Sequence, residues 1–87
     1  MARYLAKVYV VLKPTVLDAQ GLTIGRALRR LGYEAVEEVR VGKFIRIWLN
    51  DESREGAKAK VEEMCKRLLA NPVLEDFEVE VEEVGEG

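Results

Sequence analysis

Hydrophobic and polar residues alternate in four stretches of the chain, and alternation with a period of two predicts strands. The stretches are residues 3–13, 34–41, 43–50 and 77–82. Pro14 ends the first stretch, because proline lacks an N–H group and restricts the residue before it to extended geometry. Gly42 separates the second stretch from the third, which predicts a tight hairpin between them.

In two other stretches, apolar residues recur every three or four positions, which is the spacing of one helix face. The first helix is expected to begin at Asp18, a residue type that caps helix N-termini, and to end at Gly32. The second is expected to be capped by Asp51 or Ser53 and to run to about Leu69. The apolar side of the first helix holds Leu17, Gly21, Ile24, Leu28 and Leu31.

The predicted order of elements is therefore β-α-β-β-α-β, with two β-α-β halves that meet at Gly42. This order predicts an α+β fold of ferredoxin-like type, a two-layer sandwich with an antiparallel sheet and both helices on one face. We expect one domain over residues 1–84 and a frayed tail over residues 85–87. Either one chain closes the sheet alone, or the sheet takes strands from a second copy.

The sheet face away from the helices is predicted to be unusually apolar. A solvated sheet face is normally polar, whereas this one would carry two large aromatic residues from the third strand and a tyrosine from the first. Exposed apolar patches mark contacts with other surfaces, and Trp, Tyr and Arg are enriched in interface hot spots. We therefore predict an oligomer interface made of Leu5, Tyr9, Val11, Phe44, Arg46 and Trp48, with Lys7 on the same sheet face.

Length and charge narrow the classes of function. The chain has 87 residues, one cysteine, no histidine and a net charge of −2. A domain this short buries a small share of its surface, so association with other chains would stabilise it. The negative charge argues against a nucleic-acid partner. No stretch approaches the ~20 apolar residues of a membrane span, and the N-terminus lacks a signal-peptide pattern, so we expect a cytoplasmic protein with no membrane partner.

The element order also matches that of the RNA-recognition motif, which stacks bases on aromatic residues of its first and third strands. Tyr9, Phe44 and Trp48 occupy comparable positions. However, residues 41–48 match the third-strand pattern of that motif poorly, and the chain is acidic. RNA binding is therefore not favoured.

Candidate catalytic and metal-binding groups have simpler structural interpretations. Cys65 lies on the apolar stripe of the second helix, where cysteine is usually inert packing. Ser53 is the only serine and stands at a helix start, where capping is its common role. The alternating glutamates of the last strand indicate a solvated face or a protected sheet edge rather than a cation site. We expect no catalytic, cofactor-binding or metal-binding residue in this chain.

Two junctions between elements carry the most informative motifs. They read Lys13-Pro14-Thr15-Val16-Leu17-Asp18-Ala19-Gln20-Gly21 and Asn71-Pro72-Val73-Leu74-Glu75. Together with Leu31-Gly32-Tyr33 and Gly42-Lys43, in this order and at this length, they resemble the PurS family over nearly the whole chain. That family is the small subunit of phosphoribosylformylglycinamidine synthase. The chain departs from it at Thr15, where the family typically has glycine, and at Ala19, where it typically has proline.

The resemblance implies a non-catalytic assembly subunit of a purine-biosynthesis ligase. Such a subunit joins a large ATP-dependent synthetase subunit to a glutaminase subunit, so that ammonia released by the second reaches the first. ATP and magnesium would be used by the synthetase subunit, and this chain would bind no cofactor. The resemblance also implies a homodimer or a homotetramer.

We predict that contacts with the two larger subunits use both junctions and one arginine. These residues are Lys13, Pro14, Asp18, Gln20, Gly21, Arg40, Asn71, Pro72 and Glu75. The alternative is a free-standing oligomeric regulatory domain of ferredoxin-like topology that binds a small molecule.

Overall fold

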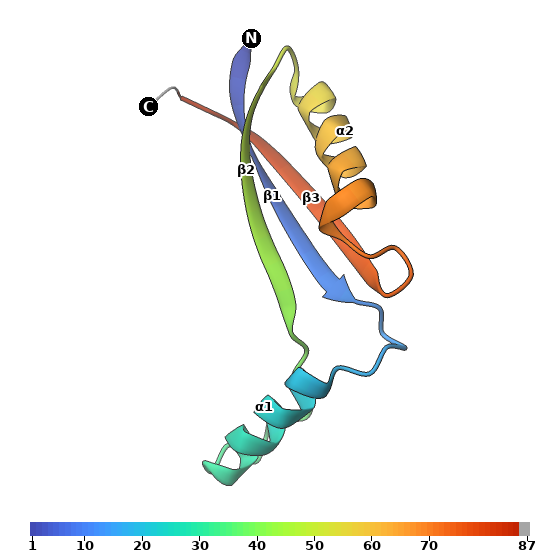
Figure 1. Cartoon of the computed structure of the whole chain (residues 1–87). Helices are drawn as coiled ribbons and strands as arrows, with labels where there is room; N and C mark the ends of the chain where they lie inside the picture. The colour runs from blue at the N-terminus through green and yellow to red at the C-terminus, as the bar shows by residue number, and fades with distance from the viewer. Residues whose placement is uncertain (86–87) are drawn as a thin grey trace.

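A computed structural model describes residues 1–85 as a three-stranded antiparallel sheet with two helices (Figure 1). The elements are β1 (Ala2–Leu12), α1 (Ala19–Arg30), β2 (Gly42–Asp51), α2 (Arg54–Met64), a π-helical turn (Cys65–Leu69) and β3 (Glu75–Val84). The strand order is β2-β1-β3, so the first strand of the chain is the central one. The predicted α+β class and antiparallel sheet are confirmed. Of the predicted tail, residues 86 and 87 lie outside the described residues.

The hydrophobic core lies between the sheet and α2. Its members alternate along β1 and β3 and recur every fourth position along α2, as the sequence pattern predicts. The buried hydrophobic residues are Tyr4, Ala6, Val8, Val10, Ala57, Val61, Cys65, Ala70, Val79 and Val81. Burial raises the pKa of the Cys65 thiol, so this cysteine is a protonated packing residue, in keeping with its expected inert role.

Two polar residues fix the start of α2. Ser53 is the cap, and its hydroxyl accepts the Gly56 N–H over 3.0 Å. Asp51 is 5% exposed, and its carboxylate accepts hydrogen bonds from the Lys60 ammonium and, over 2.7 Å, from the Glu52 N–H. The hydrogen bond from Lys60 is the main cause that lowers the pKa of the Asp51 carboxyl. Of the two predicted caps, Ser53 therefore caps the helix, while Asp51 ties the end of β2 to the middle of α2.

The predicted strand at residues 34–41 is wrong for the single chain, and so is the hairpin at Gly42. Gly42 is the first residue of β2 and pairs with Val11. A tight hairpin turn needs positive φ, and among residues 1–85 only Gly32 has it. A Cβ at position 42 would lie 2.6 Å from the carbonyl oxygen of Val10. This glycine therefore permits a close approach of two strands and forms no turn.

The expectation that both helices cover one face of the sheet is also not met within one chain. α1 stands beyond the end of the sheet, far from α2 (Figure 1). The helix itself forms as predicted, with Asp18 as its cap and Gly32 at φ 106° after its end. Its predicted apolar stripe has no sheet to cover, and Leu17 and Leu31 are 75% and 74% exposed.

The chain is correspondingly extended. Its radius of gyration is 16.8 Å and its extents are 51 × 30 × 15 Å. A compact domain of this length would have a radius of gyration of about 12 Å. One helix thus extends away from a small body that contains the sheet, α2 and the core.

Candidate functional site

The sheet face opposite α2 is open, and it carries all of the predicted oligomer residues. In the register of the sheet, Tyr9 lies opposite Phe44 and Leu5 lies opposite Trp48. Their side chains therefore form adjacent rows on β1 and β2. Phe44 is 53% exposed and Trp48 is 49% exposed, so about half of the surface of each residue remains for a partner to cover.

The aromatic residues of this open face also contact one another. The rings of Tyr9 and Phe44 stack with centroids 5.1 Å apart and 25° between their planes. The Arg46 guanidinium carbon lies 6.0 Å from the Phe44 ring centre and 5.8 Å from that of Trp48, within the range of cation–π attraction. These contacts order the surface before any partner arrives.

A row of acidic side chains completes the open face. The register places Glu78 opposite Tyr9 and Glu80 opposite Lys7, and Lys7 forms an ion pair with Glu82 at 3.4 Å. The full row is Asp76, Glu78, Glu80 and Glu82. The open face therefore has an acidic margin on β3 and a margin of aromatic residues and arginine on β2. The alternation of polar and apolar residues in the sequence showed that these glutamates share one face of the strand, but it did not show which strand would lie beside them.

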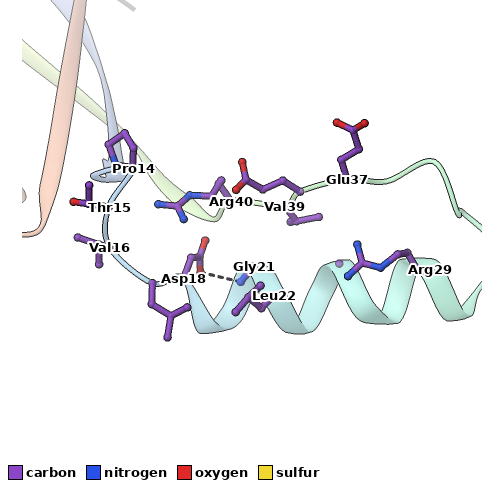
Figure 2. A pocket seen from close by; sticks show the side chains of 13 residues that line it. Pro14, Thr15, Val16, Asp18, Gly21, Leu22, Arg29, Glu37, Val39 and Arg40 are labelled. Atoms are coloured by element: carbon purple, nitrogen blue, oxygen red, sulfur yellow. Dashed lines mark hydrogen bonds between the residues drawn. The ribbon is translucent and has the colours of Figure 1, made fainter.

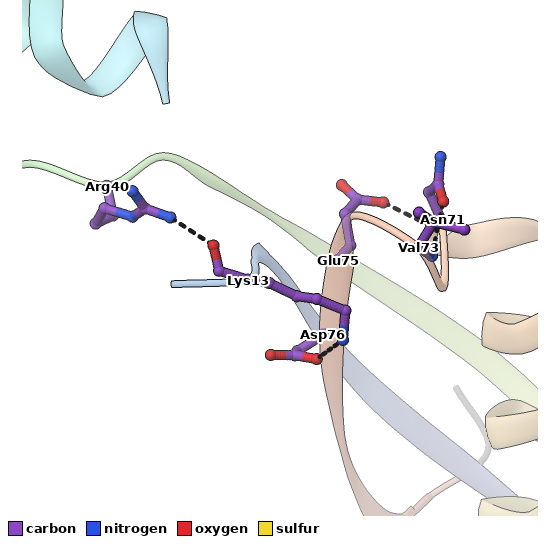
Figure 3. Close-up of polar contacts among 6 residues, drawn as sticks. All are labelled: Lys13, Arg40, Asn71, Val73, Glu75 and Asp76. Atoms are coloured by element: carbon purple, nitrogen blue, oxygen red, sulfur yellow. Dashed lines mark hydrogen bonds and ion pairs between the residues drawn. The ribbon is translucent and has the colours of Figure 1, made fainter. Parts of the chain in front are cut away.

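The two junction motifs meet at one end of the sheet, as Figure 3 shows. The Lys13 N–H donates to the Leu74 carbonyl over 2.9 Å, and the Lys13 ammonium pairs with Asp76 at 2.6 Å. Arg40 donates to the Lys13 carbonyl over 3.0 Å. The structure thus brings together predicted contact residues from three separate parts of the chain.

The second motif is held in shape by its own side chains. The Glu75 carboxylate accepts the Asn71 N–H over 2.7 Å, and the Asn71 side-chain oxygen accepts the Val73 N–H over 2.9 Å. These are turn-forming contacts of the kind that asparagine commonly makes. The turn leaves Pro72 exposed and Val73 76% exposed, so its outer surface is apolar.

Asp18 is the best-anchored residue of the first motif. It is 5% exposed, and its carboxylate accepts the Gly21 N–H over 2.8 Å and the Val41 N–H over 2.7 Å. These two hydrogen bonds, helped by the nearby Arg40, hold the pKa of the Asp18 carboxyl below its usual range, although burial opposes the shift. One side chain therefore joins the start of α1 to the residue that precedes β2.

A cleft of about 380 Å³ lies beside Asp18, between residues 14–18, α1 and residues 37–40 (Figure 2). Both of its arginines are engaged, because Arg29 donates to the Val36 carbonyl over 3.1 Å and Arg40 donates to Lys13. Glu37 and Glu38 also line the cleft, so its wall carries both signs of charge. The two arginines are thus held by backbone carbonyls and shape the wall of the cleft. Gln20 is exposed on the first turn of α1.

Within residues 1–85, no group of three or more Cys, Asp or Glu side chains is placed to hold a metal ion. In the same part of the chain, neither helix is long and apolar enough to span a membrane.

Comparison with known proteins decides the family. A family model described as PurS, phosphoribosylformylglycinamidine (FGAM) synthase, matches residues 5–83. The chain belongs to the PurS family. It is 49% identical over 81 residues to the PurS subunit of Methanocaldococcus jannaschii, covering 93% of this chain and 98% of the relative. It is 46% identical over 81 residues to the PurS subunit of Bacillus subtilis, covering 93% and 95%.

Solved PurS structures share the fold over almost the full length. The structure of Methanocaldococcus jannaschii PurS matches with a TM-score of 0.85 at 49% identity, covering 94% of this chain and 99% of the other. A chain in the structure of PurLQS from Thermotoga maritima matches with a TM-score of 0.84 at 34% identity, covering 97% and 100%. The extended shape of the single chain is thus compatible with the shape of PurS chains.

The two buried glycines of α1 in this PurS chain predict opposite responses to alanine. A Cβ on Gly21 would collide with the Val39 carbonyl oxygen and lie 2.6 Å from the Asp18 carboxylate, so Gly21→Ala should lower stability despite its better helix propensity. A Cβ on Gly25 would meet the Arg29 side chain at 3.5 Å and Val39 at 3.6 Å, which are ordinary contacts. Gly25→Ala, the matched control, should therefore be neutral or stabilising by up to about 1 kcal/mol. Urea unfolding followed by circular dichroism measures both, and equal effects would contradict the packing of α1 on residues 36–41.

The lowered pKa of Asp18 predicts a pH-dependent contribution to stability. Because the pKa in the folded chain lies below the unfolded value of about 3.9, the charged carboxylate stabilises the fold at neutral pH. That contribution is lost as the pH falls below about 4 towards the folded pKa. Asp18→Asn should be less stable than the parent at neutral pH, and the difference should narrow in acid. Unfolding free energies from about pH 7 to about pH 2 test this, and a constant difference would refute it.

Proposed function

We propose that this chain is the assembly subunit of FGAM synthase, an ATP- and glutamine-dependent ligase of purine biosynthesis. The observation that carries the proposal is membership of the PurS family over residues 5–83. The full-length similarity to a chain of PurLQS supports a role within a larger complex. The partners are a large synthetase subunit, which uses ATP and magnesium, and a glutaminase subunit. This role predicts a cytoplasmic location.

A subunit without catalytic groups acts through geometry. Ammonia released by a glutaminase has to reach the synthetase before it escapes, so the two active sites need a fixed relative position. A chain 51 Å long with two separate surfaces suits such a task. We call the Lys13–Gly21 and Asn71–Glu75 motifs, together with Arg40, the junction cluster. The open face and the junction cluster are built from different residues, so the chain can contact its own copies and other subunits at the same time.

We assign the open face to contacts between copies of this chain and the junction cluster to contacts with the larger subunits. The half-exposed rings of Phe44 and Trp48, already ordered by Arg46, supply apolar area for the first contact. At the cluster, Pro14, Gln20 and Pro72 present exposed groups to a partner. Lys13, Asp18, Gly21, Arg40, Asn71 and Glu75 act through the shape that they give to the two junctions. The regulatory-domain alternative is not favoured, because family membership points to the assembly role.

The proposed role predicts which reaction depends on this chain. Glutamine-dependent FGAM formation by the synthetase and glutaminase subunits should fall to background without the chain. Ammonia-dependent formation, which needs no transfer between subunits, should persist. Both rates are measured with and without the chain. If its omission changes neither rate, the proposed function is wrong.

Trp48→Ala should reduce the mass of the assembly in solution while leaving the fold intact. Trp48 is 49% exposed in the single chain, so its loss removes little from the core but much from a contact that covers it. Removing a hot-spot tryptophan weakens association by roughly 2 kcal/mol, or about 30-fold. Leu68→Ala is the matched control, because Leu68 is 82% exposed on the π-helical turn, away from the open face. Sedimentation measures both, and an unchanged mass for Trp48→Ala would remove the open face as an interface.

A further inference from the structure

β3 forms one edge of the sheet, and no other strand within residues 1–85 pairs with its outer side. The strand is 10 residues long and contains no proline. Its register with β1 runs from the pair Leu12–Glu75 to the pair Arg3–Val84 without a bulge. Proteins commonly protect sheet edges with short strands, prolines or bulges. β3 has none of these three devices, so its outer backbone groups are accessible to a further strand.

The register shows which residues of β3 direct their backbone groups outward. Hydrogen-bonded and non-hydrogen-bonded pairs alternate along an antiparallel ladder. One step beyond the last pair of the ladder, the Lys13 N–H donates to the Leu74 carbonyl over 2.9 Å. The even-numbered residues of β3 therefore bond to β1. The N–H and C=O groups of the odd-numbered residues point away from β1, and these residues include Phe77, Val79 and Val81.

One outward carbonyl is already occupied by a side chain. The Nε of Arg54, the first residue of α2, donates to the Val81 carbonyl over 2.8 Å. This contact agrees with the outward direction of Val81, and it ends the open part of the edge at that residue. Within residues 1–85, no hydrogen bond engages the outward groups of Phe77 and Val79. Residues 76–80 thus form the open part of the edge.

Unpaired acidic side chains lie on this part of β3. Glu78 and Glu80 are exposed, and within residues 1–85 neither forms an ion pair. The neighbouring acids Asp76 and Glu82, by contrast, pair with lysines of the same chain. Glutamates two positions apart share one side of the strand, so they favour a neighbouring segment with Lys or Arg at every second position. The β3 edge of a second copy would bring a second acidic row, and like charges disfavour that pairing.

The open part of the edge also begins where the junction cluster ends. Glu75 is the last residue of the Asn71–Glu75 motif and the first residue of β3. A segment of a larger subunit that contacts the junction cluster can therefore continue along β3. Addition of an extended segment to a sheet edge is a common mode of recognition, in which main-chain hydrogen bonds give affinity and alternate side chains give specificity.

We propose that residues 76–80 of β3 bind an extended segment of one of the larger subunits by strand addition, and that this segment carries Lys or Arg at every second position. Its basic side chains lie beside Glu78 and Glu80 on the open face. The side chains between them lie beside Phe77 on the inner face, where that residue is only partly buried, so apolar residues suit these positions. The identity of the partner rests on the proposed function.

Amide hydrogen exchange resolved to single residues tests the strand addition. In the chain alone, the N–H groups of Phe77 and Val79 should exchange much faster than those of Glu78 and Glu80, which bond to β1. When the synthetase and glutaminase subunits are added, exchange at Phe77 and Val79 should slow by at least roughly 10-fold. Slow exchange of these two groups in the chain alone would indicate pairing between copies and overturn the inference. Unchanged exchange in the assembled complex would also overturn it.

Charge reversal tests the basic character of the added segment. Glu78→Lys combined with Glu80→Lys should raise the chain concentration that gives half-maximal glutamine-dependent FGAM formation by about 10-fold. Glu78→Gln combined with Glu80→Gln, which disturbs the sheet less, should raise it by a smaller factor. Glu34→Lys combined with Glu52→Lys is the matched control, because it changes the net charge equally at exposed positions outside β3. This control should stay within about twofold of the parent chain. Circular dichroism verifies that each variant is folded.

The outcomes separate the strand addition from the proposed function. If the parent chain fails to support glutamine-dependent FGAM formation, the proposed function is wrong. If the parent chain supports it and the variants at Glu78 and Glu80 need no higher concentration than the control, only the strand addition is refuted.

Discussion

The carboxylate of Asp18 sets the path of the chain on both sides of α1. It caps the helix at Gly21 and holds the backbone of Val41, 23 residues later, just before β2 begins. α1 and residues 36–41 therefore extend from the sheet together. Gly21 is required because the Val39 backbone passes where a side chain at position 21 would lie. Without this tie, the helix would be free to swing on its two connections. The direction in which α1 and this segment point, and hence what they can contact, depends on one buried acid.

The sheet separates two tasks by its two faces. The inner face packs against α2 and forms the core, whereas the outer face carries aromatic rings, an arginine and an acidic row that the core does not use. The junction cluster lies at the end of the sheet, where Lys13 links β3 to the segment around Arg40. A family of small subunits that assemble larger ones needs such separate surfaces.

Much of this structure could be predicted from local pattern. The three strands of the sheet, both helices, the caps Asp18 and Ser53 and the aromatic face follow from periodicity and capping chemistry. The pattern at residues 34–41 also describes an extended segment with two sides, but periodicity does not name the strand beside it. Gly42 shows the same limit, since glycine serves equally for a turn and for a close approach of strands, and only the position of Val10 distinguishes them. The junction contacts depend on residues up to 63 positions apart, such as Lys13 and Asp76, and no local signal pairs them.

The central position of β1 in the sheet has a consequence for folding during synthesis on the ribosome. β1 is synthesised before the two strands that pair with it, and Leu12 pairs with Glu75 while Arg3 pairs with Val84. Half of its ladder is therefore missing until β3 has been synthesised. Contacts of such long sequence separation slow folding, and the apolar side of β1 stays without its cover during synthesis. Until then an edge of β1 is open to pairing with the wrong strand.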